Sequence, residues 1–103
     1  MASTFSGRVA FASIQFNAGV PSYRVQSGDF GAITDNGAGD ITLALASQID
    51  PADACIAFAA RGGVAIPFVQ SWTDSALQIR IDNGAGVLAD VNCDLTIVVR
   101  PGN

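Results

Sequence analysis

Apolar and polar residues alternate along much of this chain, most regularly from Ile33 to Leu45, which reads ITDNGAGDITLAL. Every second residue from Ile41 to Leu45 is apolar, so these side chains share one face of a strand. Just before that strand, Asn36 and Gly37 tolerate positive φ at little cost and let the chain reverse. The pattern therefore predicts a β-hairpin whose apolar face packs against another layer.

The pentapeptide DNGAG of this hairpin occurs a second time in the chain. The first copy is Asp35–Gly39, and the second, Asp82–Gly86, again follows an alternating run, Leu77–Ile81. The expected turn residues are Asp35, Asn36 and Gly37 in the first copy and Asp82, Asn83 and Gly84 in the second. The repetition predicts two hairpin corners and hence a closed β-domain.

Shorter alternating runs predict further strands. The expected strands are 8–16, where a change of parity predicts a bulge near Ala12 and Ser13; 23–25; 55–60; 64–70, at an edge or bulged because of Pro67; and 94–100, with Leu95, Ile97 and Val99 inward. Residues 17–22 and the segment 71–74 around Trp72 are expected to be loops, and 51–54 a short helical turn. This spacing predicts an all-β fold, an antiparallel β-sandwich or jelly-roll-like barrel of about seven or eight strands.

The length of 103 residues, half of them hydrophobic, is enough for one domain with its own core. We expect residues 7–103 to form that domain and residues 1–6 to form a flexible arm whose Phe5 docks on a neighbouring molecule. Cys55 and Cys93 each lie in an apolar run. We expect both to be buried free thiols, with a disulfide between them as the alternative.

The charged residues are five Arg and nine Asp, without any Lys, Glu or His. A net charge of −4 and scattered Arg residues argue against a nucleic-acid backbone as partner, because binding one requires clustered basic side chains. No apolar run approaches the roughly 20 residues that span a bilayer, and the start MASTFSGR lacks the apolar stretch of a signal peptide. We therefore expect a soluble chain, made in the cytoplasm, with no membrane partner.

Catalysis without His or Lys would depend on pairs of carboxylates. The candidates are Asp35 with Asp40, and pairs among Asp82, Asp90 and Asp94. An Asp before Asn-Gly is more typical of a turn, in which its side chain accepts hydrogen bonds from the backbone that follows. We therefore expect no catalytic residues and no enzymatic activity.

The segment DNGAGD also offers oxygen ligands for calcium on a glycine-rich loop. It does not match an EF-hand loop, because Leu43 occupies the position of the required bidentate acid. The second copy of the segment has Val87 where the first has Asp40. A phosphate site is not expected either, since no helix follows the glycines and the chain has no Lys. We expect neither a metal nor a cofactor.

Trp72 lies between Ser71 and Thr73 in an expected loop. There it would either stack on a sugar or anchor a protein contact, or else fill one end of the sandwich core. The pattern leaves both interpretations open.

The segment from Arg8 to Ala60 resembles a module of tailed-bacteriophage structural proteins, especially tail fibres and head fibres or decorations. The matching elements are the strand end Phe16–Asn17, the turn Ile33–Asp40, the alternating strand Ile41–Leu45, the bend Pro51–Ala54 and the strand Cys55–Ala60. The chain lacks the Trp usual near the first strand of such modules, and Arg8 stands there instead. The resemblance implies a trimeric, β-rich virion component without catalytic residues.

We therefore expect a non-enzymatic virion protein, assembled in the host cytoplasm, that binds the major capsid protein as a decoration or cement protein on the outer shell. Only the six residues of the expected arm precede the expected domain, which favours this over a fibre with a shaft. One alternative is a tail-fibre tip or receptor-binding module attached to a tail protein. Another is a calcium-dependent carbohydrate-binding module. The candidate interaction residues are Phe5, Arg8 and Trp72.

Overall fold

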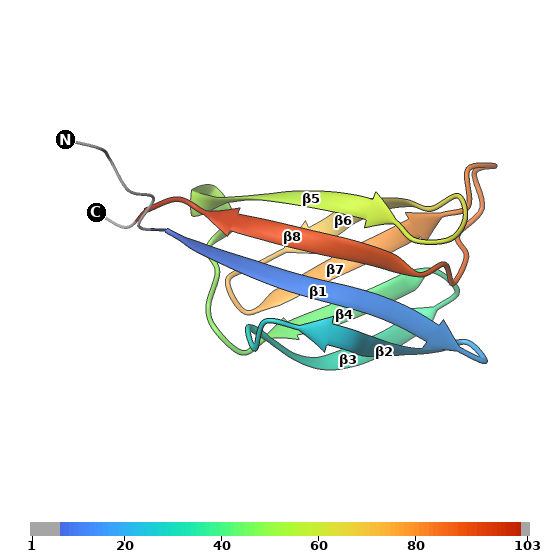
Figure 1. Ribbon diagram of the computed structural model, residues 1–103, viewed down its shortest axis with the longest axis horizontal. Coiled ribbons are helices and arrows are strands. Elements are labelled where there is room, and N and C mark those ends of the chain that lie inside the picture. Colours follow the sequence, from blue (N-terminus) through green and yellow to red (C-terminus); the bar gives the residue numbers. More distant parts are fainter. Residues whose placement is uncertain (1–6, 102–103) are drawn as a thin grey trace.

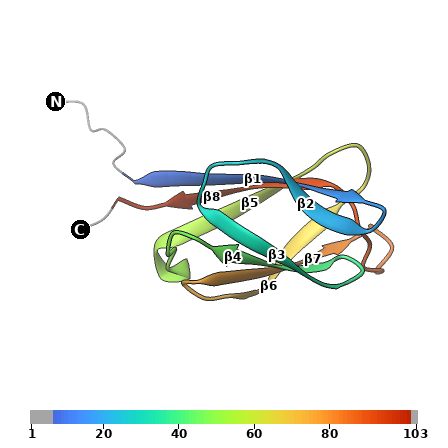
Figure 2. The ribbon, with the colours of Figure 1, turned by 90° about the horizontal axis from the view of Figure 1, so that it is seen from below.

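Two antiparallel sheets packed face to face make up the molecule, as Figures 1 and 2 show. The structure, a computed structural model, describes residues 7–101, which form eight strands and one short 3-10 helix. The first sheet has the order β2 (Val20–Gln26), β1 (Arg8–Asn17), β8 (Cys93–Val99), β5 (Ala54–Ala60); the second has the order β3 (Phe30–Gly37), β4 (Asp40–Leu45), β7 (Ala76–Asp82), β6 (Ile66–Trp72). The predicted all-β sandwich is confirmed, whereas the arm expected for residues 1–6 lies outside the described residues.

The core lies between the two sheets and comes mainly from strands that alternate strictly. The fully or almost fully buried side chains of β4, β7 and β8 are Ile41, Leu43, Leu45, Leu77, Ile79, Ile81, Cys93, Leu95 and Ile97. Burying one Leu or Ile side chain of this kind contributes about 1.5–3 kcal/mol relative to leaving it in water. Alternation in these strands therefore predicted the inward faces correctly.

Strand β1 differs from the prediction. Ala10, Ala12 and Ile14 face the core, while Val9 and Phe11 lie on the outer face, and β1 pairs with β8 without a break. The register shift predicted near Ser13 exists, but the extra residue is Arg24 in β2. The inward face of β1 could not be recognised from the sequence, because two of its residues are alanines, which are only weakly apolar.

Two loops are shorter than predicted. Residues 17–22 were expected to be a loop, yet Ala18 and Gly19 alone reverse the chain, with φ of 52° and 80°. Positive φ at both central residues is typical of a type I′ hairpin turn. The loop expected around Trp72 is also wrong, because Trp72 ends β6 and pairs with Leu77, and the chain turns after it.

Other local predictions are confirmed. The 3-10 helix η1 (Pro51–Asp53) forms at the expected position, where the Asp50 side chain accepts a hydrogen bond from the Ala52 N–H at 2.9 Å. Pro67 lies in β6, an edge strand of the second sheet. An edge strand tolerates proline because one side of it needs no ladder hydrogen bonds.

The two cysteines are free thiols, as predicted, but only Cys93 is buried. Cys55 is exposed because Ile56 and Phe58 take the inward positions of β5 and leave Cys55 on the outer face. Burial, with a smaller contribution from the negative charge of Asp94, raises the pKa of the Cys93 thiol to about 11. Cys93 therefore stays protonated at neutral pH, when its thiol is a weak nucleophile.

Candidate interaction surfaces

The two DNGAG segments lie side by side at one end of the sandwich. Strands β4 and β7 are paired with Asp40 opposite Arg80, and the Ile81 N–H donates to the Gly39 carbonyl at 2.7 Å. Ile81 directly precedes the second copy, and Gly39 ends the first. The sheet therefore brings together two segments that are far apart in the sequence.

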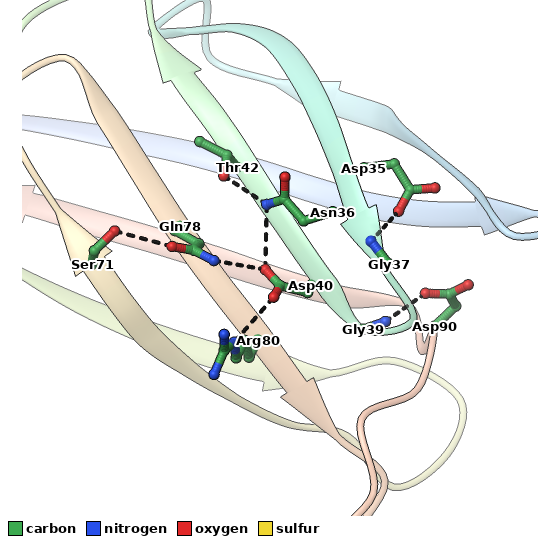
Figure 3. A network of polar contacts seen from close by, with 10 residues as sticks. All are labelled: Asp35, Asn36, Gly37, Gly39, Asp40, Thr42, Ser71, Gln78, Arg80 and Asp90. Carbon is green, nitrogen blue, oxygen red and sulfur yellow. Dashed lines mark hydrogen bonds and ion pairs between the residues drawn. The ribbon is translucent and has the colours of Figure 1, made fainter.

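The first segment reverses the chain later than predicted. Strand β3 continues to Gly37, which pairs with Asp40, and the reversal takes place at Ala38 and Gly39. Asp35 accepts a hydrogen bond from the Gly37 N–H at 3.0 Å, and a register shift follows between these two residues (Figure 3). The expected reversal at Asn36 and Gly37 is wrong because that part of the segment forms a bulge in β3 instead.

The second segment reverses the chain but does not join two of the named strands into a hairpin. Asp82 Oδ1 accepts hydrogen bonds from the N–H groups of Gly84 at 2.7 Å and Gly86 at 3.2 Å. Beyond this turn the chain makes one isolated bridge, between Asp82 and Leu88, and then crosses to β8 in the other sheet. The predicted second corner is therefore a short reversal, in which the Asn83 N–H donates to the Val87 carbonyl at 2.9 Å and the Ala89 N–H to the Ile81 carbonyl at 3.0 Å. It leads into a crossover between the sheets and not into a second hairpin strand.

A residue from that crossover holds the first turn. Asp90 Oδ1 accepts a hydrogen bond from the N–H of Gly39 at 2.7 Å (Figure 3). Gly39 is buried, with φ of 62°, and a Cβ atom there would lie 2.5 Å from the Ala89 nitrogen and 2.7 Å from the Ile81 carbonyl oxygen. From the sequence, Asp90 was only a possible catalytic carboxylate, because nothing local indicates a contact with a residue 51 positions away.

Asp40 is the centre of a polar network on the outer face of the second sheet (Figure 3). Its carboxylate accepts hydrogen bonds from Gln78 Nε2 at 2.9 Å and Asn36 Nδ2 at 3.3 Å, and pairs with Arg80 Nε at 3.1 Å. Asn36 Nδ2 also donates to Thr42 Oγ1 at 2.8 Å. The hydrogen bond from Gln78, followed by those from Asn36 and Arg80, holds the pKa of Asp40 below its ordinary value of 3.8. Because these groups bind one another, the network holds their side chains in place on the outer face of the second sheet.

The carboxylates that were candidates for acid–base chemistry are separately engaged. Asp35 and Asp82 accept hydrogen bonds from backbone N–H groups of their own turns, and Asp40 pairs with Arg80. Asp94 lies on β8, in the other sheet, 3.7 Å from Arg61. Within residues 7–101, no group of three or more His, Cys, Asp or Glu side chains is placed to hold a metal ion.

The outer face of the first sheet is apolar over about half its length. Val98 of β8 lies between Val9 and Cys55, and in the next row Thr96 lies between Phe11 and Ala57. We call the following residues the apolar face: Val9, Phe11, Val25, Cys55, Ala57 and Val98. Its three valines, Val9, Val25 and Val98, are 52%, 47% and 38% exposed. Beside it, a shallow depression of about 330 Å³ is lined by Ala54, Cys55, Val98 and Pro101 and by the ion pair Asp53–Arg100.

A polar cluster bounds the apolar face in the row where Ser13 and Asp94 lie beside Val25. The buried hydroxyl of Ser13 accepts hydrogen bonds from Arg24 Nε at 3.2 Å and Arg61 Nη1 at 2.6 Å. Arg61 also lies 3.7 Å from Asp94. Nothing in the sequence indicates this cluster, because its members come from four separate segments. Only the pairing of Ser13 with Asp94 across β1 and β8 brings them together.

The remaining candidate residues have structural contacts. Trp72 is partly buried and packs on the core, which favours the core interpretation over an exposed sugar or protein contact. Arg8 donates a hydrogen bond to the Gln48 carbonyl and lies 4.0 Å from Asp29. It therefore connects the start of β1 to the two loops that contain Gln48 and Asp29. Phe5 lies outside the described residues.

Among residues 7–101, no helix is long and apolar enough to cross a bilayer. Comparisons of this chain with protein-family models, with curated proteins and with solved structures gave no match. A functional conclusion therefore rests on the geometry of the outer faces of the two sheets and on the resemblance in the sequence.

Proposed function

We propose that this chain is a non-catalytic structural protein of a tailed-phage virion that binds the outer surface of the capsid as a decoration protein. The observation that carries the proposal is the apolar face of the first sheet. Three partly exposed valines, Phe11 and small outward residues share that face, and the Ser13 polar cluster bounds it. A contiguous apolar area with a polar boundary is typical of surfaces that bind another protein.

The shape of the surface favours a protein partner over a small molecule. Ligand pockets are concave and bury most of their ligand. The depression beside Cys55 and Val98 is shallow, and the rest of the apolar face lies on the outer side of a sheet. A broad surface of this kind fits the exterior of a protein shell, and the resemblance of residues 8–60 to phage head and tail modules supports a phage capsid as that shell.

Binding to shells tests the proposal. Capsids of the phage that carries this gene, purified without the protein, are mixed with the full chain, sedimented and assayed for bound protein. We expect Val9→Asp to abolish most of the binding, because it places a charge in the apolar face. The matched control is Ile66→Asp, which changes a residue that is also 52% exposed but lies in β6 of the second sheet.

Each result of this assay has a consequence. Shell binding by Ile66→Asp but not by Val9→Asp supports the proposal. Full occupancy by Val9→Asp removes the apolar face from the mechanism. Binding to purified tails, with none to shells, would contradict the capsid assignment and favour a tail location.

A further inference from the structure

The four edge strands of the sandwich differ in how they resist pairing with another strand. Unpaired edge N–H and C=O groups attract strands from other molecules, and prolines, bulges and charges prevent this. The edges are β2 and β5 in the first sheet and β3 and β6 in the second. In β2, Pro21 and the bulge at Arg24 interrupt the edge; β6 has Pro67 and a register shift after Val69; β3 has two register shifts.

Strand β5 has none of these features. Its sequence ACIAFAA contains no charged residue and no proline, and it pairs with β8 without a shift from Ala54 opposite Val99 to Ala60 opposite Cys93. Figure 1 shows β5 along one border of its sheet. Among residues 7–101, no strand is paired to its other side. Strand β5 is therefore a regular and unprotected edge.

We propose that β5 pairs antiparallel with β5 of a second copy of this chain, about a two-fold axis through Ala57, so that two first sheets become one. This register pairs all seven residues of the strand. It places Ile56 opposite the partner's Phe58 on the inward side, where both residue types are partly buried in the single chain. On the outward side it places Cys55 opposite the partner's Ala59, and these small residues leave room for close approach.

Charges at the two ends of β5 fit the same register. One residue before the strand is Asp53, and one residue after it is Arg61. Antiparallel pairing about Ala57 brings the end of the strand that follows Asp53 near the partner's Arg61, and the two-fold axis repeats this approach. Within each chain Asp53 pairs with Arg100 at 2.8 Å and Arg61 donates to Ser13, so neither charge is left to repel the partner. Opposite charges facing each other across strands stabilise the pairing, whereas like charges oppose it. The chain is therefore complementary to itself along this edge in side-chain size, and no like charges face each other at the two ends of the strand.

The pairing of β5 with β5 of a second copy does not depend on capsid binding. The dimer that it forms differs from the trimer that the resemblance implies. A two-fold interface uses the same strand of both copies, so it closes at two. The two apolar faces then lie on the same side of one continuous sheet. Molecular mass in solution separates the proposal from capsid attachment, because the dimer is expected without any shell present.

The first experiment measures mass by sedimentation equilibrium of the full chain. We expect a dimer at micromolar concentrations. Ala57→Lys sets two ammonium groups against each other on the axis, and we expect it to raise the dissociation constant about tenfold. Ala57 is exposed, so thermal melting at a concentration where both proteins are monomeric should be unchanged. The control is Ala32→Lys, at an exposed position of the β3 edge, which should leave the dimer intact.

The second experiment tests the register directly with cysteines. Residues directly opposite in an antiparallel pair have Cα atoms about 4.5–5.5 Å apart, which suits a disulfide. Ala59→Cys should therefore cross-link rapidly to the partner's Cys55 under mild oxidation and give a dimer on a non-reducing gel. The same substitution combined with Cys55→Ser should not, and neither should Ala44→Cys, at an exposed position in the second sheet.

A monomer at high micromolar concentration would overturn the proposal, and so would a trimer. A dimer that Ala57→Lys does not weaken would place the contact elsewhere and overturn it as well. Rapid cross-linking of Ala59→Cys, together with weakening by Ala57→Lys alone, supports pairing through β5.

Discussion

The two DNGAG segments have the same five residues and different structures. Both begin with an Asp whose side chain accepts a hydrogen bond from the N–H two residues later, at 3.0 Å in the first copy and 2.7 Å in the second. The first copy then closes a hairpin between β3 and β4, while the second starts the crossover from β7 to β8. The pentapeptide therefore sets a local turn, and the residues around it decide what the turn connects.

The residue that follows each copy shows the difference. Asp40 follows the first copy and is bound by Gln78 and Arg80 of the neighbouring strand. Val87 follows the second and is 56% exposed. The first copy is also enclosed, because Gly39 packs against the backbone of Ile81 and Ala89. The enclosed copy should therefore tolerate substitution much less than the exposed one.

The largest difference should appear at the last glycine of each copy. In Gly39→Ala the new Cβ meets backbone atoms at 2.5 and 2.7 Å, and φ is 62°. We expect a loss of about 3 kcal/mol or more in the free energy of unfolding, measured by urea denaturation. Gly86→Ala has φ of 80° but no atom within 4 Å, so about 1–2 kcal/mol is expected. Equal losses in the two variants would show that the enclosure of Gly39 is unimportant.

Asp90→Ala should have the next largest effect. It removes the acceptor of the Gly39 N–H, which is buried, and a buried donor without a partner costs about 1–3 kcal/mol. Asp90→Asn keeps an oxygen at that place and should recover most of the stability in the same denaturation assay. A loss as large in Asp90→Asn as in Asp90→Ala would assign the effect to the charge and not to the hydrogen bond.

Smaller effects are expected at the first residue of each copy. Asp82 accepts two backbone hydrogen bonds within its turn and Asp35 accepts one. Asp82→Ala should cost about 1–2 kcal/mol and Asp35→Ala about 0.5–1 kcal/mol. Hydrogen exchange of the Gly84 and Gly86 amides should accelerate in Asp82→Ala. Exchange of the Gly37 amide should accelerate in Asp35→Ala. Unchanged exchange of these amides would contradict the assigned side-chain bonds.

The smallest effect should depend on pH and should belong to the first copy alone. The folded structure lowers the pKa of Asp40 below 3.8, mainly through the hydrogen bond from Gln78. The stabilisation that comes from the lowered pKa of Asp40 is fully present above the pKa of this residue in the unfolded chain. It is lost as the pH falls through the lower pKa of Asp40 in the folded protein. We expect the difference in unfolding free energy between wild type and Asp40→Asn to shrink below about pH 4. Melts between pH 2.5 and 7 measure it, and a constant difference would contradict the assignment.

The sequence by itself determined where most of the strands lie and which faces of most of them are buried. In β4, β7 and β8 the apolar residues alternate strictly, and strand geometry turns that period of two directly into one buried face. The helical turn after Asp50 and the edge position of Pro67 also follow from local chemistry, since proline lacks an N–H donor. Such features need no knowledge of distant residues.

Only the tertiary structure decided the rest. Whether a DNGAG turn closes a hairpin or starts a crossover depends on which strand lies beside it, and Asp90 reaches Gly39 across 51 residues. The exposure of Cys55 depends on Ile56 and Phe58 taking the inward positions of β5, and the inward alanines of β1 are recognisable only from the strands packed against them. Each of these depends on contacts between distant segments, and a periodic pattern along one segment contains no information about its neighbours in space.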